Sequence, residues 1–222
     1  MNTFSKVMLG LVGTFVVAAG AACYLHPKVK TLAELQSSTV SITMADGATC
    51  SGWVLKGSHK VITAAHCVET DNGIYSVMQV DFHDGTGKHL FMPSKVGDIT
   101  GEKPDLAVLE PLPKEKIKWP EGLSVCPFKP YYREPLLMFG DPLGFPQAIS
   151  GGYVSNPAQK VVGAREAPYI QYDGALSPGN SGGAAVDVEY QCVIASADAL
   201  IQSYSGSAIN FLEPADRLSE LK

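Results

Sequence analysis

The chain has 222 residues, of which 45% are hydrophobic and 18% are charged, and its formal net charge at pH 7 is −5. This length and apolar content suit one large domain or two small ones with buried cores, and they exclude a disordered or fibrous chain. The acidic balance, with no Walker glycine loop and no dinucleotide fingerprint, gives no reason to expect a nucleic acid or nucleotide partner.

Residues 7–25 form an uncharged, almost wholly apolar run that Lys6 precedes and two lysines follow. A helix of this length can span a bilayer, while the Ala-Gly-Ala triplet at 19–21 also fits a signal peptidase site. We expect residues 1–30 to be a signal peptide or a signal anchor that contacts the membrane if it is not cleaved. We favour the anchor because cleaved apolar segments are usually shorter. The lysines are balanced on both sides and leave the orientation open.

Further along, short apolar segments alternate with turns rich in Gly, Pro, Asn and Asp. In residues 40–44, for example, apolar and polar side chains alternate as in a strand with one buried face. This pattern is typical of an all-β barrel. The strands that we expect cover residues 40–44, 52–55, 60–63, 74–82, 106–110, 136–140, 148–154, 160–162, 169–172, 184–187, 193–197 and 207–211. A Pro near the start and two leucines on one face predict a short helix over residues 214–222.

Three segments carry the residue types of nucleophilic catalysis. They are Thr-Ala-Ala-His-Cys at 63–67, Asp-Leu-Ala-Val-Leu at 105–109 and Gly-Asn-Ser-Gly-Gly at 179–183. A serine nucleophile needs an imidazole to take its proton, a carboxylate to orient the imidazole and N–H groups to hold an oxyanion. In α/β-hydrolases the histidine follows the serine, and here no histidine follows Ser181. The subtilisin order, with aspartate first, does not match either, which leaves the chymotrypsin arrangement.

At these residues the chain resembles the chymotrypsin-like serine proteases. The amino-acid sequence of residues 138–144 and 175–183 is most similar to that of the HtrA (Deg) branch of the family. The resemblance covers roughly residues 37–212 and implies two six-stranded antiparallel β-barrels. The expected organisation is a protease domain over 31–222, with a first barrel at about 37–112, a linker at 113–135, a second barrel at 136–212 and the helix at 214–222.

The resemblance implies a serine endopeptidase that acts on protein or peptide substrates through an acyl-enzyme. In it His66 is the general base, Asp105 orients the imidazole and Ser181 is the nucleophile. The backbone N–H groups of Gly179 and Ser181 would form the oxyanion hole. Asn180 stands where digestive relatives have an aspartate that binds a newly cleaved amino terminus. An amide cannot form that ion pair, so we expect no activation by cleavage of the amino terminus.

The carboxylate that orients His66 is selected from several candidates, and the residues that line the substrate pocket follow from the resemblance. Asp71, Asp81 and Asp84 compete with Asp105 by position, but they lie in polar segments, whereas Asp105 precedes an apolar strand whose edge tolerates a carboxylate only with a specific partner. The substrate pocket carried over from the family would be lined by Ala175, Leu176, Ser207 and Ala208. Because Ala175 replaces the acidic floor of trypsin-like members, we expect small or medium aliphatic P1 residues.

The cysteines indicate the compartment. In the resembled family, cysteines at the places of Cys50 and Cys67 form a disulfide that clamps the histidine loop, and Cys126 would then pair with Cys192. Such bonds, worth about 3 and about 4 kcal/mol in a chain-entropy estimate, persist in oxidising compartments. We therefore expect an extracytoplasmic domain that is periplasmic, secreted or luminal.

The sequence also offers a metal site and a non-catalytic protein as alternatives to the protease. His83 and His89 could suggest a metal, but residues 81–89 look like an exposed hairpin turn, so we expect no metal and no cofactor. The alternative of another class is a catalytically silent, protease-shaped binding module or a holdase. The sequence does not indicate an oligomeric state.

Overall fold

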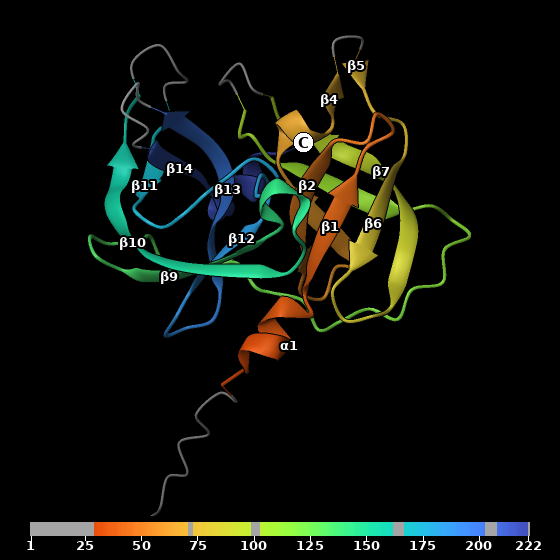
Figure 1. Cartoon of the computed structure of the whole chain (residues 1–222), viewed down its shortest axis with the longest axis horizontal. Helices are drawn as coiled ribbons and strands as arrows, with labels where there is room; N and C mark the ends of the chain where they lie inside the picture. Colours follow the sequence, from red (N-terminus) through yellow and green to blue (C-terminus); the bar gives the residue numbers. More distant parts are fainter. Residues whose placement is uncertain (1–28, 71–72, 99–102, 162–166, 203–207, 222) are drawn as a thin grey trace, which may run out of the picture.

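The structure, a computed structural model, describes residues 29–70, 73–98, 103–161, 167–202 and 208–221. Two closed antiparallel barrels of six strands each lie next to one another, which confirms the expected fold class (Figure 1).

The first barrel has the order β1-β2-β3-β8-β7-β6. Its strands are β1 Thr39–Thr43, β2 Thr49–Leu55, β3 Lys60–Thr63, β6 Met78–Phe82, β7 Gly87–Val96 and β8 Ala107–Pro111. The second barrel has the order β10-β11-β14-β13-β12-β9. Its strands are β9 Pro135–Gly140, β10 Ala148–Gln159, β11 Tyr169–Tyr172, β12 Ala184–Asp187, β13 Val193–Gln202 and β14 Ala208–Pro214. Shorter elements are α1 Leu32–Gln36, β4 Glu69–Thr70, β5 Gly73–Ile74 and the 3-10 helices η1 Ala65–Cys67, η2 Pro142–Gly144 and η3 Ala215–Glu220.

Some expected elements differ from those observed. The strand expected over 74–82 is divided into β5 and β6, and the strand expected from residue 160 is wrong because β10 ends at Gln159. Residues 83–86 are the turn of a hairpin whose second strand, β7, was missed because Phe91 alone among its side chains is buried. The expected carboxy-terminal helix is the 3-10 helix η3.

Apolar clusters fill each barrel, and a third cluster joins them. In β1, Val40 and Ile42 point into the first barrel, as their alternation predicts. The joining cluster includes Trp53 from β2 and Phe139 from β9. The indole Nε1–H of Trp53 donates a hydrogen bond of 3.0 Å to Ser196 Oγ in β13. The two barrels are thus packed and hydrogen-bonded across a buried interface.

Both disulfides implied by the resemblance are present. Cys50–Cys67 joins β2 to η1, and Cys126–Cys192 joins the linker between the barrels to the turn before β13. The first bond therefore fixes the segment that carries His66.

The segment before the first barrel is attached to the second one. Thr31 caps α1, because its Oγ1 accepts a hydrogen bond of 3.2 Å from the Glu34 N–H. The backbone of Lys30 exchanges hydrogen bonds of 2.6 and 2.7 Å with the Gln191 amide. Among the residues that the structure describes, there is no helix with the length and apolar character needed to cross a bilayer. The apolar run at 7–25 lies outside the described residues, so the signal or anchor remains a prediction.

A pair of carboxyl groups is buried in the second barrel. Glu134 is fully buried and Asp187 is 1% exposed. Glu134 Oε2 accepts a hydrogen bond of 3.0 Å from the Tyr131 N–H. Burial, together with the hydrogen bond and the charge of Asp187, raises the pKa of Glu134 to about 7. Glu134 is therefore largely protonated below neutral pH in the folded chain.

This pair predicts a pH-dependent stability. The raised pKa stabilises the fold fully below the unfolded value near 4.5, and this contribution disappears as the pH rises through about 7. It amounts to at most about 3 kcal/mol. Glu134→Gln keeps a donor to Asp187 without a charge, so we expect its free energy of unfolding to fall less than that of the wild type between pH 5 and pH 8. Denaturant titrations at both pH values measure this, and parallel changes in the two proteins would contradict it.

Candidate active site

Two neighbouring strands of the first barrel bring His66 and Asp105 together. Thr63 at the end of β3 pairs with Ala107 at the start of β8, so the residues beyond them meet at one edge of the barrel. His66 Nδ1 lies 2.6 Å from Asp105 Oδ2, and the His66 backbone N–H donates to Asp105 Oδ1 at 2.9 Å. The Asp105 side chain is 7% exposed and that of His66 is 33% exposed. The carboxylate thus fixes both the ring and the backbone of the histidine.

The electrostatics of this pair favour a charged carboxylate. Burial lowers the pKa of His66, but the hydrogen bond and charge of Asp105, with the charges of Asp198 and Glu69, outweigh it and raise the pKa above 6.5. Burial raises the pKa of Asp105, but its hydrogen bonds and attraction to His66 lower the pKa overall. The Asp105 carboxylate therefore holds the proton on Nδ1, and the neutral ring presents Nε2 as a base.

The segment around Ser181 is attached to the same edge of the first barrel. The Ser51 N–H donates to the Ser181 carbonyl at 2.9 Å, and Cys67 Sγ lies 3.8 Å from the same oxygen. Gly182 has φ +81°, and a Cβ there would overlap Thr63 Oγ1. Only glycine permits this close approach, so the serine segment lies directly against the histidine segment.

A β-turn precedes the serine. The Asn180 N–H donates to the Ser177 carbonyl at 3.0 Å, with Pro178 and Gly179 between them and φ +97° at Gly179. Pro at the second and Gly at the third position fit a type II turn. The Pro178 carbonyl accepts a hydrogen bond of 2.6 Å from the Leu143 N–H. Because a trans peptide is planar, the Gly179 N–H points the opposite way.

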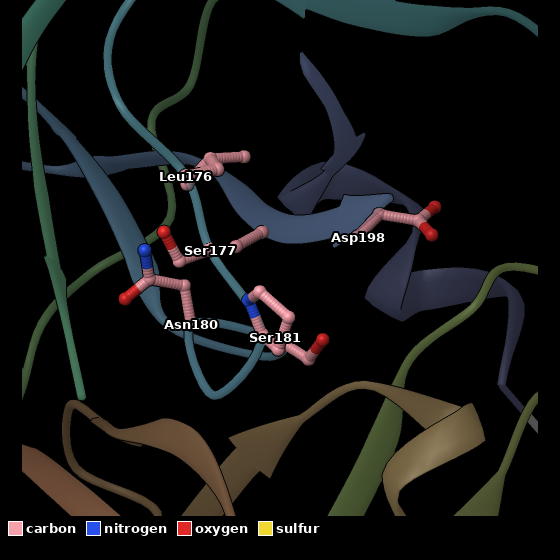
Figure 2. A pocket seen from close by; sticks show the side chains of 7 residues that line it. Leu176, Ser177, Asn180, Ser181 and Asp198 are labelled. Atoms are coloured by element: carbon pink, nitrogen blue, oxygen red, sulfur yellow. The ribbon is translucent and has the colours of Figure 1, made fainter. Parts of the chain in front are cut away.

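A cavity of about 230 Å³ opens beside Ser181 (Figure 2). It is lined by Leu176, Ser177, Pro178, Asn180, Ser181, Ala197 and Asp198. Of the four expected lining residues, Leu176 lies on this cavity, whereas Ala175 lines a second one with Ser150 and Met138. Ala208 is exposed at the start of β14, and Ser207 lies outside the described residues.

Sequence reasoning missed Ala197 and Asp198. They lie where β13 shifts register against β14, and such bulges redirect a side chain. A ring nitrogen of His66 and carboxylate oxygens of Asp105 and Asp198 lie within 4.8 Å of one another. Figure 2 shows the Asp198 carboxylate directed away from Leu176 and Asn180. The sequence signal for Asp198 was a charged residue in the middle of a mostly apolar strand.

The other histidines in the part of the chain that the structure describes have separate partners. His83 was expected in an exposed turn, but its side chain is 3% exposed, so this expectation is wrong. It is buried because it bonds to β1 of the first barrel and faces Asp141 of the second. His59 stacks on Trp119 with ring centroids 5.2 Å apart. His89 Nδ1 lies 2.7 Å from Glu115 Oε2.

Residues 50–195 match the family described as trypsin-like peptidase domain, and the chain belongs to this family. A curated relative from Hahella chejuensis, described as a probable periplasmic serine endoprotease DegP-like, is 28% identical over 172 residues. The match covers 76% of this chain and 33% of that relative, so the chain spans about a third of its length.

Solved structures share the fold. The HtrA-type protease AlgW with tripeptide has a TM-score of 0.68 at 23% identity, covering 86% of this chain and 62% of that one. A serine endoprotease from Yersinia pestis has a TM-score of 0.67 at 18% identity, covering 86% and 65%. The Hahella chejuensis relative is described as DegP-like and AlgW as HtrA-type, which is the branch that the motifs resemble.

The contact between His66 and Asp105 predicts how the pKa of His66 responds to a substitution of Asp105. We expect the wild-type His66 imidazole to titrate above 6.5 and that of Asp105→Asn below the wild-type value, because the variant loses the charge that stabilises the imidazolium while burial remains. NMR of the ring resonances across pH measures both values. An unchanged His66 pKa in the variant would contradict the assigned contact.

Proposed function

We propose that the protein is a serine endopeptidase that cleaves peptide bonds with His66, Asp105 and Ser181. The observation that carries this proposal is the double contact of Asp105 with His66 at the edge to which the Ser181 segment is bound. A membership in the trypsin-like peptidase family supports it.

The reaction takes two steps. Nε2 of His66 accepts the proton of the Ser181 hydroxyl as Oγ attacks the carbonyl carbon of the substrate, and the resulting imidazolium then protonates the leaving amine. In the second step Nε2 of His66 accepts a proton from water as the water attacks the acyl carbon, and the imidazolium then returns this proton to Ser181 Oγ as the acid product leaves. The Asp105 carboxylate stabilises the imidazolium in both steps, and the backbone N–H groups of Gly179 and Ser181 hold the oxyanion.

The cavity beside Ser181 is proposed to take the P1 side chain. Leu176 and Ala197 give the cavity an apolar wall, and the Asp198 carboxylate points away from Leu176. Small or medium aliphatic P1 residues would fill this volume, while Lys or Arg would lose hydration with no counter-ion on that wall.

Two disulfides and the periplasmic description of the curated relative support an extracytoplasmic location for this domain. We also propose that the apolar run at 7–25, where it is not cleaved, anchors this domain to the membrane.

A silent binding module or holdase is the competing function. A fluorophosphonate probe distinguishes the two, because it reacts only with an activated serine. We expect it to label the wild type stoichiometrically but not Ser181→Ala, whose turnover should fall about 10⁶-fold. Ser58→Ala is the matched control and should be labelled like the wild type, since it removes a hydroxyl from a turn that lines neither cavity. A wild type that stays unlabelled, or a labelled Ser181→Ala, would contradict the protease.

The pocket gives a second prediction. In a peptide library, we expect cleavage after Ala, Val or Leu to exceed cleavage after Lys or Arg by at least about tenfold in kcat/KM. The Asp198 carboxylate lies beside His66 and Asp105, away from the apolar wall, so a P1 cation on that wall would lose hydration without a partner, at a cost of more than about 1.4 kcal/mol. A larger side chain at the wall, Ala197→Leu, should shift the preference toward Ala. A wild-type preference for basic P1 residues would defeat the assignment of this cavity.

A further inference from the structure

The loop between β9 and β10, residues 141–147, has an unfavourable backbone. Leu143, Gly144 and Gln147 have φ values of +55°, +78° and +64°. For the two non-glycine residues, this left-handed conformation costs about 1–2 kcal/mol each. Contacts from outside the loop must therefore hold it in place.

Both peptides that flank Gly179 depend on this loop. The Leu143 N–H donates to the Pro178 carbonyl at 2.6 Å. Ser51 Oγ donates to the Gly179 carbonyl at 2.7 Å and accepts from the Asp141 N–H at 2.8 Å. A Cβ on Gly179 would overlap the Asp141 carbonyl, so the two segments are in direct contact. The loop thus fixes which way the Gly179 N–H points.

Asp141 anchors the loop to the first barrel. Its Oδ1 accepts a hydrogen bond of 2.8 Å from the Gln147 N–H, closing the loop, and lies 3.5 Å from His83 Nε2. The side chains of both residues are 3% exposed. The His83 ring in turn bonds to Thr39 Oγ1 at 2.8 Å and Ser41 Oγ at 2.9 Å, both in β1.

We propose that His83 and Asp141 are a pair of positioning residues, which hold residues 141–147 so that the Gly179 N–H faces the oxyanion. This inference rests on the proposed protease function. The pair links the two barrels at a site remote in sequence from the three catalytic segments. Its buried polar contacts explain how a strained loop keeps one conformation.

Two inhibitors with one peptide sequence separate this role from a general loss of structure. A peptide aldehyde forms a hemiacetal with Ser181, whose oxygen occupies the oxyanion hole, whereas the corresponding peptide alcohol fills the same subsites without an oxyanion. The wild type should bind the aldehyde much more tightly than the alcohol. Equal wild-type affinities would refute the protease itself, independently of the positioning pair.

The variants test the pair. For Asp141→Ala we expect kcat and aldehyde affinity to fall about 100-fold, within the range for a lost oxyanion donor, with KM and alcohol affinity within about twofold of the wild type. Asp141→Asn keeps an oxygen acceptor for the Gln147 N–H and should retain most of the aldehyde preference. Asp84→Ala is the matched control, because it also removes a carboxylate that closes a turn, at Thr86.

Partial unfolding weakens the apparent affinities for the aldehyde and the alcohol by the same factor, so the ratio of the two affinities does not depend on how much of the protein is folded. A loss confined to the aldehyde therefore cannot come from partial unfolding. Should Asp141→Ala not fold, His83→Ala carries the same comparison, with a loss of about tenfold in aldehyde affinity. The proposal is overturned if the variant that folds loses aldehyde and alcohol affinity equally, if it loses neither, or if Asp141→Asn behaves like Asp141→Ala.

Discussion

The apolar contact between the two barrels is the constraint on which the rest of the site depends. His66 and Asp105 belong to the first barrel, whereas Ser181 belongs to the second. Trp53 and Phe139 are 0% and 1% exposed in the cluster between them, and each such side chain contributes about 2–3 kcal/mol when buried. The energy that packs the barrels is therefore the energy that brings together the three proposed catalytic residues.

Polar contacts turn this packing into one specific geometry. Ser51 is central, because its backbone and hydroxyl contact Ser181, Gly179, Asp141 and Thr63. Unpaired polar groups at a buried interface are costly, so a small rotation of one barrel against the other would break several bonds at once. Apolar packing supplies stability here, and the hydrogen bonds select the alignment.

The features that depend on a local sequence pattern were predicted correctly. The features that arise from contacts between distant segments of the chain were not. The strand β1 was expected because Val40 and Ile42 alternate with polar residues, and the three segments were recognised by their order. The strand β7 was missed because Phe91 is its one buried side chain. The contact of His83 with Asp141 and the bulge that presents Asp198 arise from pairing between remote parts of the chain, which no local pattern encodes.

The most direct measurement is a crystal structure of the wild type with a peptide aldehyde. We expect a covalent bond from Ser181 Oγ to the aldehyde carbon, His66 Nε2 within hydrogen-bond distance of that Oγ, and the hemiacetal oxygen bound by the N–H groups of Gly179 and Ser181. An aldehyde that leaves Ser181 unmodified, or a His66 ring turned away from Oγ, would contradict the assembly of one catalytic site from the two barrels.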